Sequence, residues 1–231
     1  MEPKEVADPA SLRGLIHIWG AAGSGKSLLA AYMALAAVSR GRVVWLSLDG
    51  KMSVLRRLRS ILEHHECAID SVDVVVTEGH REAYNTVIEM TSRLDESTVL
   101  LVIDPITRVL DMSREEDLMW GRELIEDILP ALAALTTTRS VTVVVVSEMR
   151  EVSGRPVAVH YESILRWVDR DLVLRRRPFA HASEVYERTS KDREEMLGHL
   201  HLMGSCGLIW EPAQSETLNG RARGIAREVA V

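Results

Sequence analysis

The sequence predicts an α/β protein in which helices flank a mostly parallel central sheet, with an antiparallel extension toward the C-terminal end. From residue 14 to residue 147, apolar strand-like runs alternate with amphipathic helical runs. The runs at 98–103 and 141–147 are almost continuously apolar, which is typical of parallel strands covered on both faces. After Ser147 come shorter strand runs separated by turns, and this pattern favours antiparallel pairing.

The alternation places each element in order. Strands are predicted at 14–19, 42–48, 72–77, 98–103 and 141–147, and helices at 27–38, 51–64, 80–94 and 114–135. Ser113 and Glu116 fit a capping box for the last helix, and Pro130 is expected to kink or shorten it. The polar stretch 149–159 is predicted to be a loop. Further strands are predicted at 170–175, 183–189, 198–203 and 206–210.

Composition limits the class of protein. The 231 residues fit one domain, with an N-terminal segment at 1–11, a core at 12–210 and a tail at 211–231. A net charge of −6 excludes a generally basic nucleic-acid coat, so any DNA contact must be local. The chain shows no apolar run long enough to span a bilayer and no signal-peptide core, which predicts a cytoplasmic protein without membrane contact. The scarcity of Asn and Gln suggests a thermophilic source.

The most specific motif is a phosphate-binding P-loop. Residues 20–27 read Gly-Ala-Ala-Gly-Ser-Gly-Lys-Ser and fit G-x-x-x-x-G-K-[ST] between a predicted strand and a predicted helix. Glycines let backbone N–H groups turn toward phosphate oxygens, and the helix N-terminus favours an anion. Lys26 is expected to reach the β- and γ-phosphates, and the Ser27 hydroxyl to hold Mg²⁺. The expected ligand is ATP, and the expected contacts are Gly20, Ala21, Ala22, Gly23, Ser24, Gly25, Lys26, Ser27 and Leu28.

Two acids follow predicted parallel strands and complete the predicted site. Asp104 ends the apolar run 99–103, which is the Walker B pattern, and is expected to hold Mg²⁺ beside the P-loop. The alternative is a turn acid before Pro105. Asp49 follows the strand at 42–48 and can position the attacking water, although a simple Asp-Gly turn explains it equally well.

Ser147 and Glu148 close the strand predicted at 141–147. Polar groups at this place can sense the γ-phosphate and pass its presence to the following segment. Ordinary termination of a strand is the alternative interpretation.

Two other groups of residues have a structural interpretation. His64-His65-x-Cys67 has no matching second cluster, which favours a structural role over a metal site. The run Arg175–Arg177 ends a predicted strand and favours a solvated sheet edge over a phosphate contact.

Taken in order, these motifs resemble the RecA-type recombinase ATPases, and within them the archaeal RadA paralogues of RadB type. The resemblance covers residues 12–210. It rests on the P-loop, the acid-Gly pair at 49–50, the Walker B strand, the polar pair at 147–148 and the run Asp171-Leu-Val-Leu-Arg175. It implies a RecA-like core that binds Mg·ATP.

The resemblance also implies roles for single residues. The family's catalytic base is usually Glu, and the matching Asp49 is one methylene shorter, which implies slow hydrolysis. The segment from Met149 to Arg155 falls at the family's second DNA-binding loop and carries Arg150 and Arg155. Lys191 falls in the segment that reaches a neighbouring subunit's nucleotide.

The resemblance implies a slow ATPase that assists or regulates homologous recombination and DNA repair. Its expected partners are a RadA-type recombinase or another paralogue, single-stranded DNA bound weakly and salt-sensitively, and other copies in an oligomer. The alternative is a KaiC-like signalling ATPase that acts through protein partners without DNA. A third interpretation is a nucleotide-responsive scaffold with almost no turnover.

Overall fold

The computed structural model describes residues 8–50, 52–110, 121–177, 181–190 and 193–214. Within these ranges, nine strands form one sheet in the order β11-β10-β9-β8-β1-β5-β4-β2-β3. The parallel strands are β1 (Leu15–Gly20), β2 (Arg42–Ser47), β3 (Val72–Val76), β4 (Thr98–Asp104), β5 (Thr142–Ser147) and β8 (Arg170–Arg176). The antiparallel strands are β9 (Ala182–Ser190), β10 (Arg193–Met203) and β11 (Gly207–Pro212). The predicted α/β fold with an antiparallel C-terminal extension is therefore confirmed.

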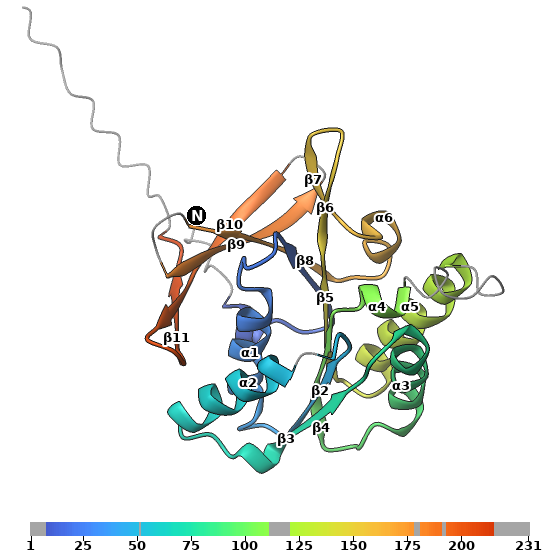
Figure 1. The fold of residues 1–231 in the computed structure, drawn as a ribbon, viewed down its shortest axis with the longest axis horizontal. Coiled ribbons are helices and arrows are strands. Elements are labelled where there is room, and N and C mark those ends of the chain that lie inside the picture. The colour runs from blue at the N-terminus through green and yellow to red at the C-terminus, as the bar shows by residue number, and fades with distance from the viewer. Residues whose placement is uncertain (1–7, 51, 111–120, 178–180, 191–192, 215–231) are drawn as a thin grey trace, which may run out of the picture.

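Helices cover both faces of the parallel part of the sheet (Figure 1). α1 (Lys26–Ala37) and α2 (Met52–His64) pack on one face, and α3 (His80–Arg93) and α5 (Gly121–Thr138) pack on the other. The shorter elements are α4 (Thr107–Leu110), α6 (Tyr161–Ile164), η1 (Pro9–Ser11) and η2 (Ile69–Ser71). None of the described helices is long and apolar enough to cross a membrane.

The apolar strands split their side chains between two cores. In β1, Ile16 and Ile18 join the core beneath α1, whereas Leu15 joins the core beneath α5. Successive side chains of a strand point to opposite faces, so a strand between two helical layers must be apolar on both. Each fully buried Leu or Ile contributes about 1.5–3 kcal/mol relative to an exposed one. The two cores therefore fix the sheet, and its carboxyl edge becomes a rigid platform.

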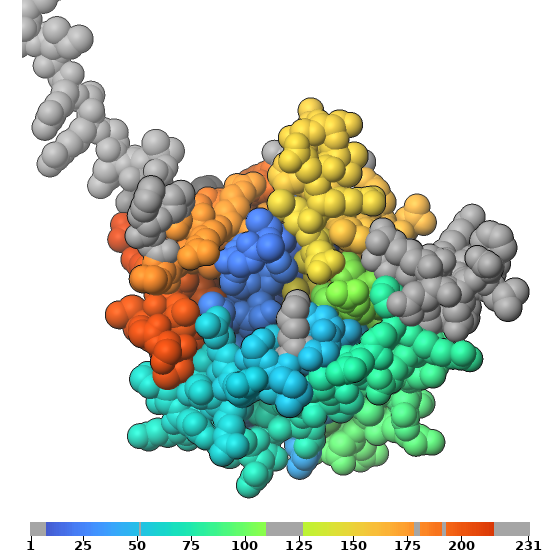
Figure 2. All heavy atoms as spheres, viewed as in Figure 1, coloured from blue at the N-terminus to red at the C-terminus, as the bar shows by residue number. Residues whose placement is uncertain are grey.

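The stretch 149–159, predicted as a loop, is instead an antiparallel hairpin. β6 (Met149–Val152) and β7 (Arg155–Ala158) pair with each other as a separate two-stranded sheet. Ser153 and Gly154 both have positive φ, 52° and 76°, as a two-residue hairpin turn requires. The hairpin projects beyond the rest of the surface (Figure 2).

Two helix and strand boundaries also differ from prediction. α5 continues past Pro130 to Thr138, so this proline does not shorten the helix. Ser113 and Glu116, the predicted capping box, lie outside the described residues. β10 begins at Arg193, although a strand was predicted only from residue 198, because β10 pairs with the long strand β9 through a bulge between Met196 and Gly198.

Candidate nucleotide site

The P-loop lies between β1 and α1 at the carboxyl edge of the sheet. Gly25 begins α1 with φ of 95°, a conformation that favours glycine. Gly20 must also be glycine, because a Cβ there would collide with the carbonyl oxygen of Leu174 on β8. The loop therefore follows a path that larger residues could not take at these two positions.

Lysine and serine of the P-loop are both held in place by oxygen acceptors. The Lys26 Nζ donates to the carbonyl oxygens of Gly20 and Ala21, each at 2.9 Å. The Ser27 hydroxyl donates to Asp104 Oδ2 at 2.6 Å, which joins the P-loop helix to the end of β4. A hydroxyl and a carboxylate oxygen in contact are the hard ligands that suit Mg²⁺. The two predicted metal ligands thus lie together and fit the ion.

One cavity of about 570 Å³ brings the predicted residues of four segments together. Its walls include Ala22, Gly23, Lys26, Ser27, Asp49, Asp104, Glu148 and Arg150. Asp49 is half-buried just beyond β2, so it faces the same space as the P-loop lysine. Because parallel strands end at one edge, residues far apart in sequence converge here.

Ser147 takes a different position from its neighbour Glu148. Glu148 is exposed and lines the cavity, whereas Ser147 is fully buried and its Oγ lies 2.6 Å from His17 Nε2. Direct contact with a γ-phosphate is therefore open to Glu148 and closed to Ser147. Arg150, predicted as a DNA contact, lines the cavity from β6.

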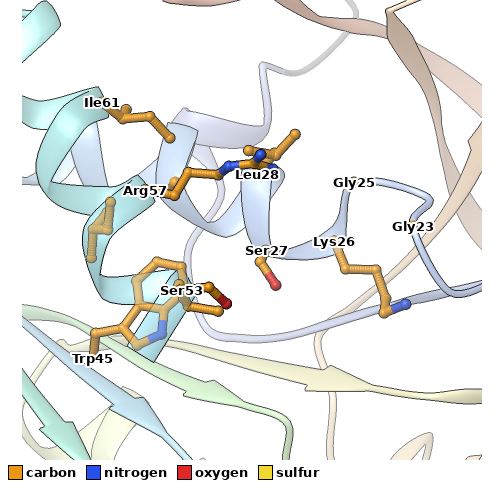
Figure 3. Close-up of a pocket in the computed structure, with 12 residues that line it drawn as sticks. Gly23, Gly25, Lys26, Ser27, Leu28, Trp45, Ser53, Arg57 and Ile61 are labelled. Carbon is orange, nitrogen blue, oxygen red and sulfur yellow. The ribbon is translucent and has the colours of Figure 1, made fainter. Parts of the chain in front are cut away.

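A second cavity of about 410 Å³ continues from the P-loop between α1 and α2 (Figure 3). Leu28 and Ala31 of α1 face Val54, Leu58 and Ile61 of α2 across it. The exposed side chain of Arg57 extends from α2 toward Leu28, and Trp45 of β2 lies beneath Ser53. Sequence reasoning missed this wall, although α2 follows directly after the Asp49-Gly50 pair.

The other predicted residues fall in three places. Arg150 and Arg155 lie on one face of the β6–β7 hairpin, because Arg150 pairs with Val157 and Val152 pairs with Arg155. The run Arg175–Arg177 does not lie at a sheet edge, since β8 sits between β1 and β9. Lys191 lies outside the described residues.

Comparison with known families agrees with this geometry. Residues 7–154, which contain the P-loop, Asp49 and Asp104, match the AAA domain family. The chain belongs to the AAA domain family. A search of curated proteins found no match to this AAA domain protein.

Solved structures show which variant of the AAA domain protein's fold this is. The crystal structure of the RadB recombinase aligns with a TM-score of 0.66 and 19% identity, covering 82% of this chain and 87% of that chain. A second solved structure, the ATPase domain of another protein, aligns with a TM-score of 0.60 and 14% identity, covering 87% of this chain and 85% of that one. At these identities the likeness concerns the fold, which is that of a RecA-like P-loop NTPase.

Proposed function

We propose that this protein binds Mg·ATP, hydrolyses it slowly and assists or regulates homologous recombination. The observation that carries the nucleotide part is the contact of Ser27 with Asp104 at 2.6 Å, at the wall of the cavity that Lys26 and Asp49 also line. A phosphate tail needs backbone donors, an ammonium and a metal site in one place. The described residues supply all three around one cavity.

The second cavity is the proposed site of the nucleotide base. It begins at the P-loop and is lined mainly by apolar side chains, with the guanidinium of Arg57 at its mouth. Small-molecule sites are typically apolar clefts with a few polar groups, and arginine stacks well on flat aromatic rings. Arg57 and Leu28 are therefore proposed to hold the base between α2 and α1.

The proposed hydrolysis depends on Asp49. Bound Mg²⁺ would neutralise charge on the phosphates, as it does in other P-loop NTPases. Asp49 faces the cavity from the end of β2, where it can orient and deprotonate a water molecule. An aspartate reaches less far than a glutamate, and a misplacement of about 1 Å can lower a rate about a hundredfold. Slow turnover follows.

The hairpin supports the DNA part of the proposal. Arg150 and Arg155 share one face with Val152, whose residue is 45% exposed. Two guanidinium groups beside an apolar side chain suit the phosphates and sugars of a single strand more than base-specific contacts. The fold likeness to the RadB recombinase agrees with this role and with a recombinase of RadA type as the protein partner.

Calorimetry with Mg²⁺ and a non-hydrolysable ATP analogue tests the nucleotide part. We expect Lys26→Ala to weaken binding roughly tenfold to a hundredfold, since a charge-assisted hydrogen bond contributes about 1.5–3 kcal/mol. Arg93→Ala, which removes an exposed cation of α3, is the control and should bind as the parent does. No heat from the parent, or equal affinity of parent and Lys26→Ala, would refute nucleotide binding here.

Fluorescence anisotropy with single-stranded DNA across a salt series tests the DNA part. Each phosphate contact contributes about −0.7 to the slope of log affinity against log salt, so Arg150→Ala and Arg155→Ala should each flatten it by about that amount. Arg93→Ala should leave the slope unchanged. A parent that binds Mg·ATP but no DNA at low salt would refute the recombination role and favour the KaiC-like signalling role.

A further inference from the structure

A chain of buried hydrogen bonds lies beside the nucleotide cavity. His17 Nδ1 is 2.8 Å from Asp171 Oδ1, and His17 Nε2 is 2.6 Å from Ser147 Oγ. The Trp19 indole donates to Asp171 Oδ1 and the Tyr161 hydroxyl donates to Asp171 Oδ2, each at 2.9 Å. These side chains come from β1, β5, β8 and α6, so the chain of contacts joins four elements that are far apart in sequence.

The donors and acceptors of this chain are matched throughout. A carboxylate only accepts, so Asp171 receives the His17 Nδ1–H together with the indole and phenol hydrogens. His17 Nε2 then accepts from the Ser147 hydroxyl. Burial raises the pKa of Tyr161 to about 12, which keeps the phenol a donor. Residues His17 and Ser147 are 0% exposed and Asp171 is 3% exposed.

Ser147, His17 and Asp171 have the contact pattern of a hydrolase triad, but the position of the serine excludes that activity. A nucleophilic serine must present its Oγ to a substrate and to an oxyanion site. Ser147 has no exposed surface, and its hydroxyl is committed to His17. The array is therefore a connection inside the protein rather than a reactive centre.

The two ends of the array meet functional segments. Ser147 directly precedes Glu148, which lines the 570 Å³ cavity. Tyr161 packs with Trp19 and Ala158 in a small core, against which Met149 and Val157 of the hairpin base also pack. The ring of Tyr161 lies 5.6 Å from that of Trp19, centroid to centroid. One end thus belongs to the cavity and the other to the base of the hairpin.

We propose that His17 and Asp171 are positioning residues that join the end of β5 to the base of the β6–β7 hairpin, so that nucleotide in the cavity changes the mobility of the hairpin. This inference rests on the proposed nucleotide binding. It adds the path: Ser147 to His17, His17 to Asp171, and Asp171 to Tyr161. A buried polar group that loses its partner is costly, so these groups keep their bonds and move together.

Hydrogen exchange of the hairpin amides, followed by mass spectrometry, tests the path in the full chain. In the parent, Mg²⁺ with a non-hydrolysable ATP analogue should slow exchange over 149–158 about tenfold, within the usual range of coupling between sites. Tyr161→Phe deletes only the hydroxyl that donates to Asp171 and keeps the ring on Trp19. We expect it to bind the analogue as the parent does and to lose most of that slowing.

Tyr32→Phe is the matched control, because the Tyr32 hydroxyl also donates to a carboxylate, Asp8 Oδ2 at 3.0 Å, but outside this array. It should keep the response of the hairpin. Ser147→Ala opens the path at its other end and should also lose the response. A merely structural array would predict lower unfolding temperatures for Tyr161→Phe and Ser147→Ala with the hairpin response intact.

The outcomes separate this inference from the proposed function. No binding of the analogue by the parent would refute both. Binding by the parent with no slowing in the hairpin, or with equal slowing in Tyr161→Phe and Ser147→Ala, would overturn the path alone. Loss of slowing in both variants, with binding retained in Tyr161→Phe and the response retained in Tyr32→Phe, would support it.

Discussion

The ends of β4 and β5 lie side by side at the carboxyl edge, yet their polar residues serve different ends. Asp104 meets the P-loop Ser27 and lines the large cavity, with 9% of the residue exposed. Ser147 meets His17 inside the protein and has no exposed surface. In both strands an apolar run ends in a polar residue, so the direction of the side chain decides between a site and an internal connection.

The largest effect should separate these two strand ends in catalysis. We expect Asp104→Asn to lower the rate of Mg²⁺-dependent ATP hydrolysis roughly a hundredfold to a thousandfold, because a preorganised group facing the phosphates contributes directly to the transition state. Ser147→Ala should lower that rate less than about tenfold, because its hydroxyl does not face the cavity. Phosphate release assays on both variants measure the difference. Equal losses would contradict the comparison.

Stability should show the opposite order. His17→Ala removes the central partner of Asp171 and Ser147, and we expect a loss of about 3 kcal/mol in the free energy of unfolding. Asp104→Asn should cost less than about 1 kcal/mol, because the amide still contacts Ser27 at the cavity wall. Urea unfolding followed by circular dichroism measures both. A smaller loss for His17→Ala than for Asp104→Asn would remove the array's structural role.

The length of the acid at position 49 should have a moderate effect. Asp49→Glu extends the carboxylate by one methylene into the cavity, and we expect the rate of hydrolysis to rise about tenfold or more. Asp49→Asn is the matched control and should lower the rate. If neither variant changes the rate while Mg·ATP still binds, Asp49 takes no part in hydrolysis and the protein acts as a nucleotide-responsive scaffold.

The parts of the site that sequence predicted are those set by local pattern. The P-loop is one contiguous motif, and Asp104 follows an apolar strand that must end at the same edge. The hairpin was missed because its strands are short and polar, although the Ser153-Gly154 pair was a visible signal for a two-residue turn. Hairpin pairing wins here because it satisfies the backbone groups of both short segments.

The buried array could not be read from the sequence. His17 was an anomaly in the apolar run 15–19, but its partners Ser147 and Asp171 lie 130 and 154 residues away. Only the strand order, with β1 between β5 and β8, brings them together. The base cavity was missed for a similar reason, since Arg57 reaches it only through the packing of α2 against α1.

The smallest expected effect concerns an exposed counterpart of the buried histidine. The N–H of Leu208 on β11 donates to His65 Nε2 at 3.0 Å, so His65 accepts only when neutral. Partial burial, and then the neighbouring His64, lower the pKa of His65 below its ordinary 6.5. Between that lowered pKa and 6.5 the unfolded chain binds more protons, so the contribution of His65 is present above 6.5 and is lost as pH falls through the lowered pKa.

His65→Gln keeps an acceptor within reach of β11 but cannot titrate. We therefore expect the parent to lose slightly more stability than His65→Gln between about pH 7.5 and about pH 5.5, with a small difference because His65 is exposed. Thermal unfolding of both proteins at the two pH values measures this, and comparing the two cancels the titration of the other histidines. A parent that loses no more than the variant would show that the contact with Leu208 does not depend on the neutral imidazole. In that case burial, as at His17, would be required for a histidine to contribute to the stability of this fold.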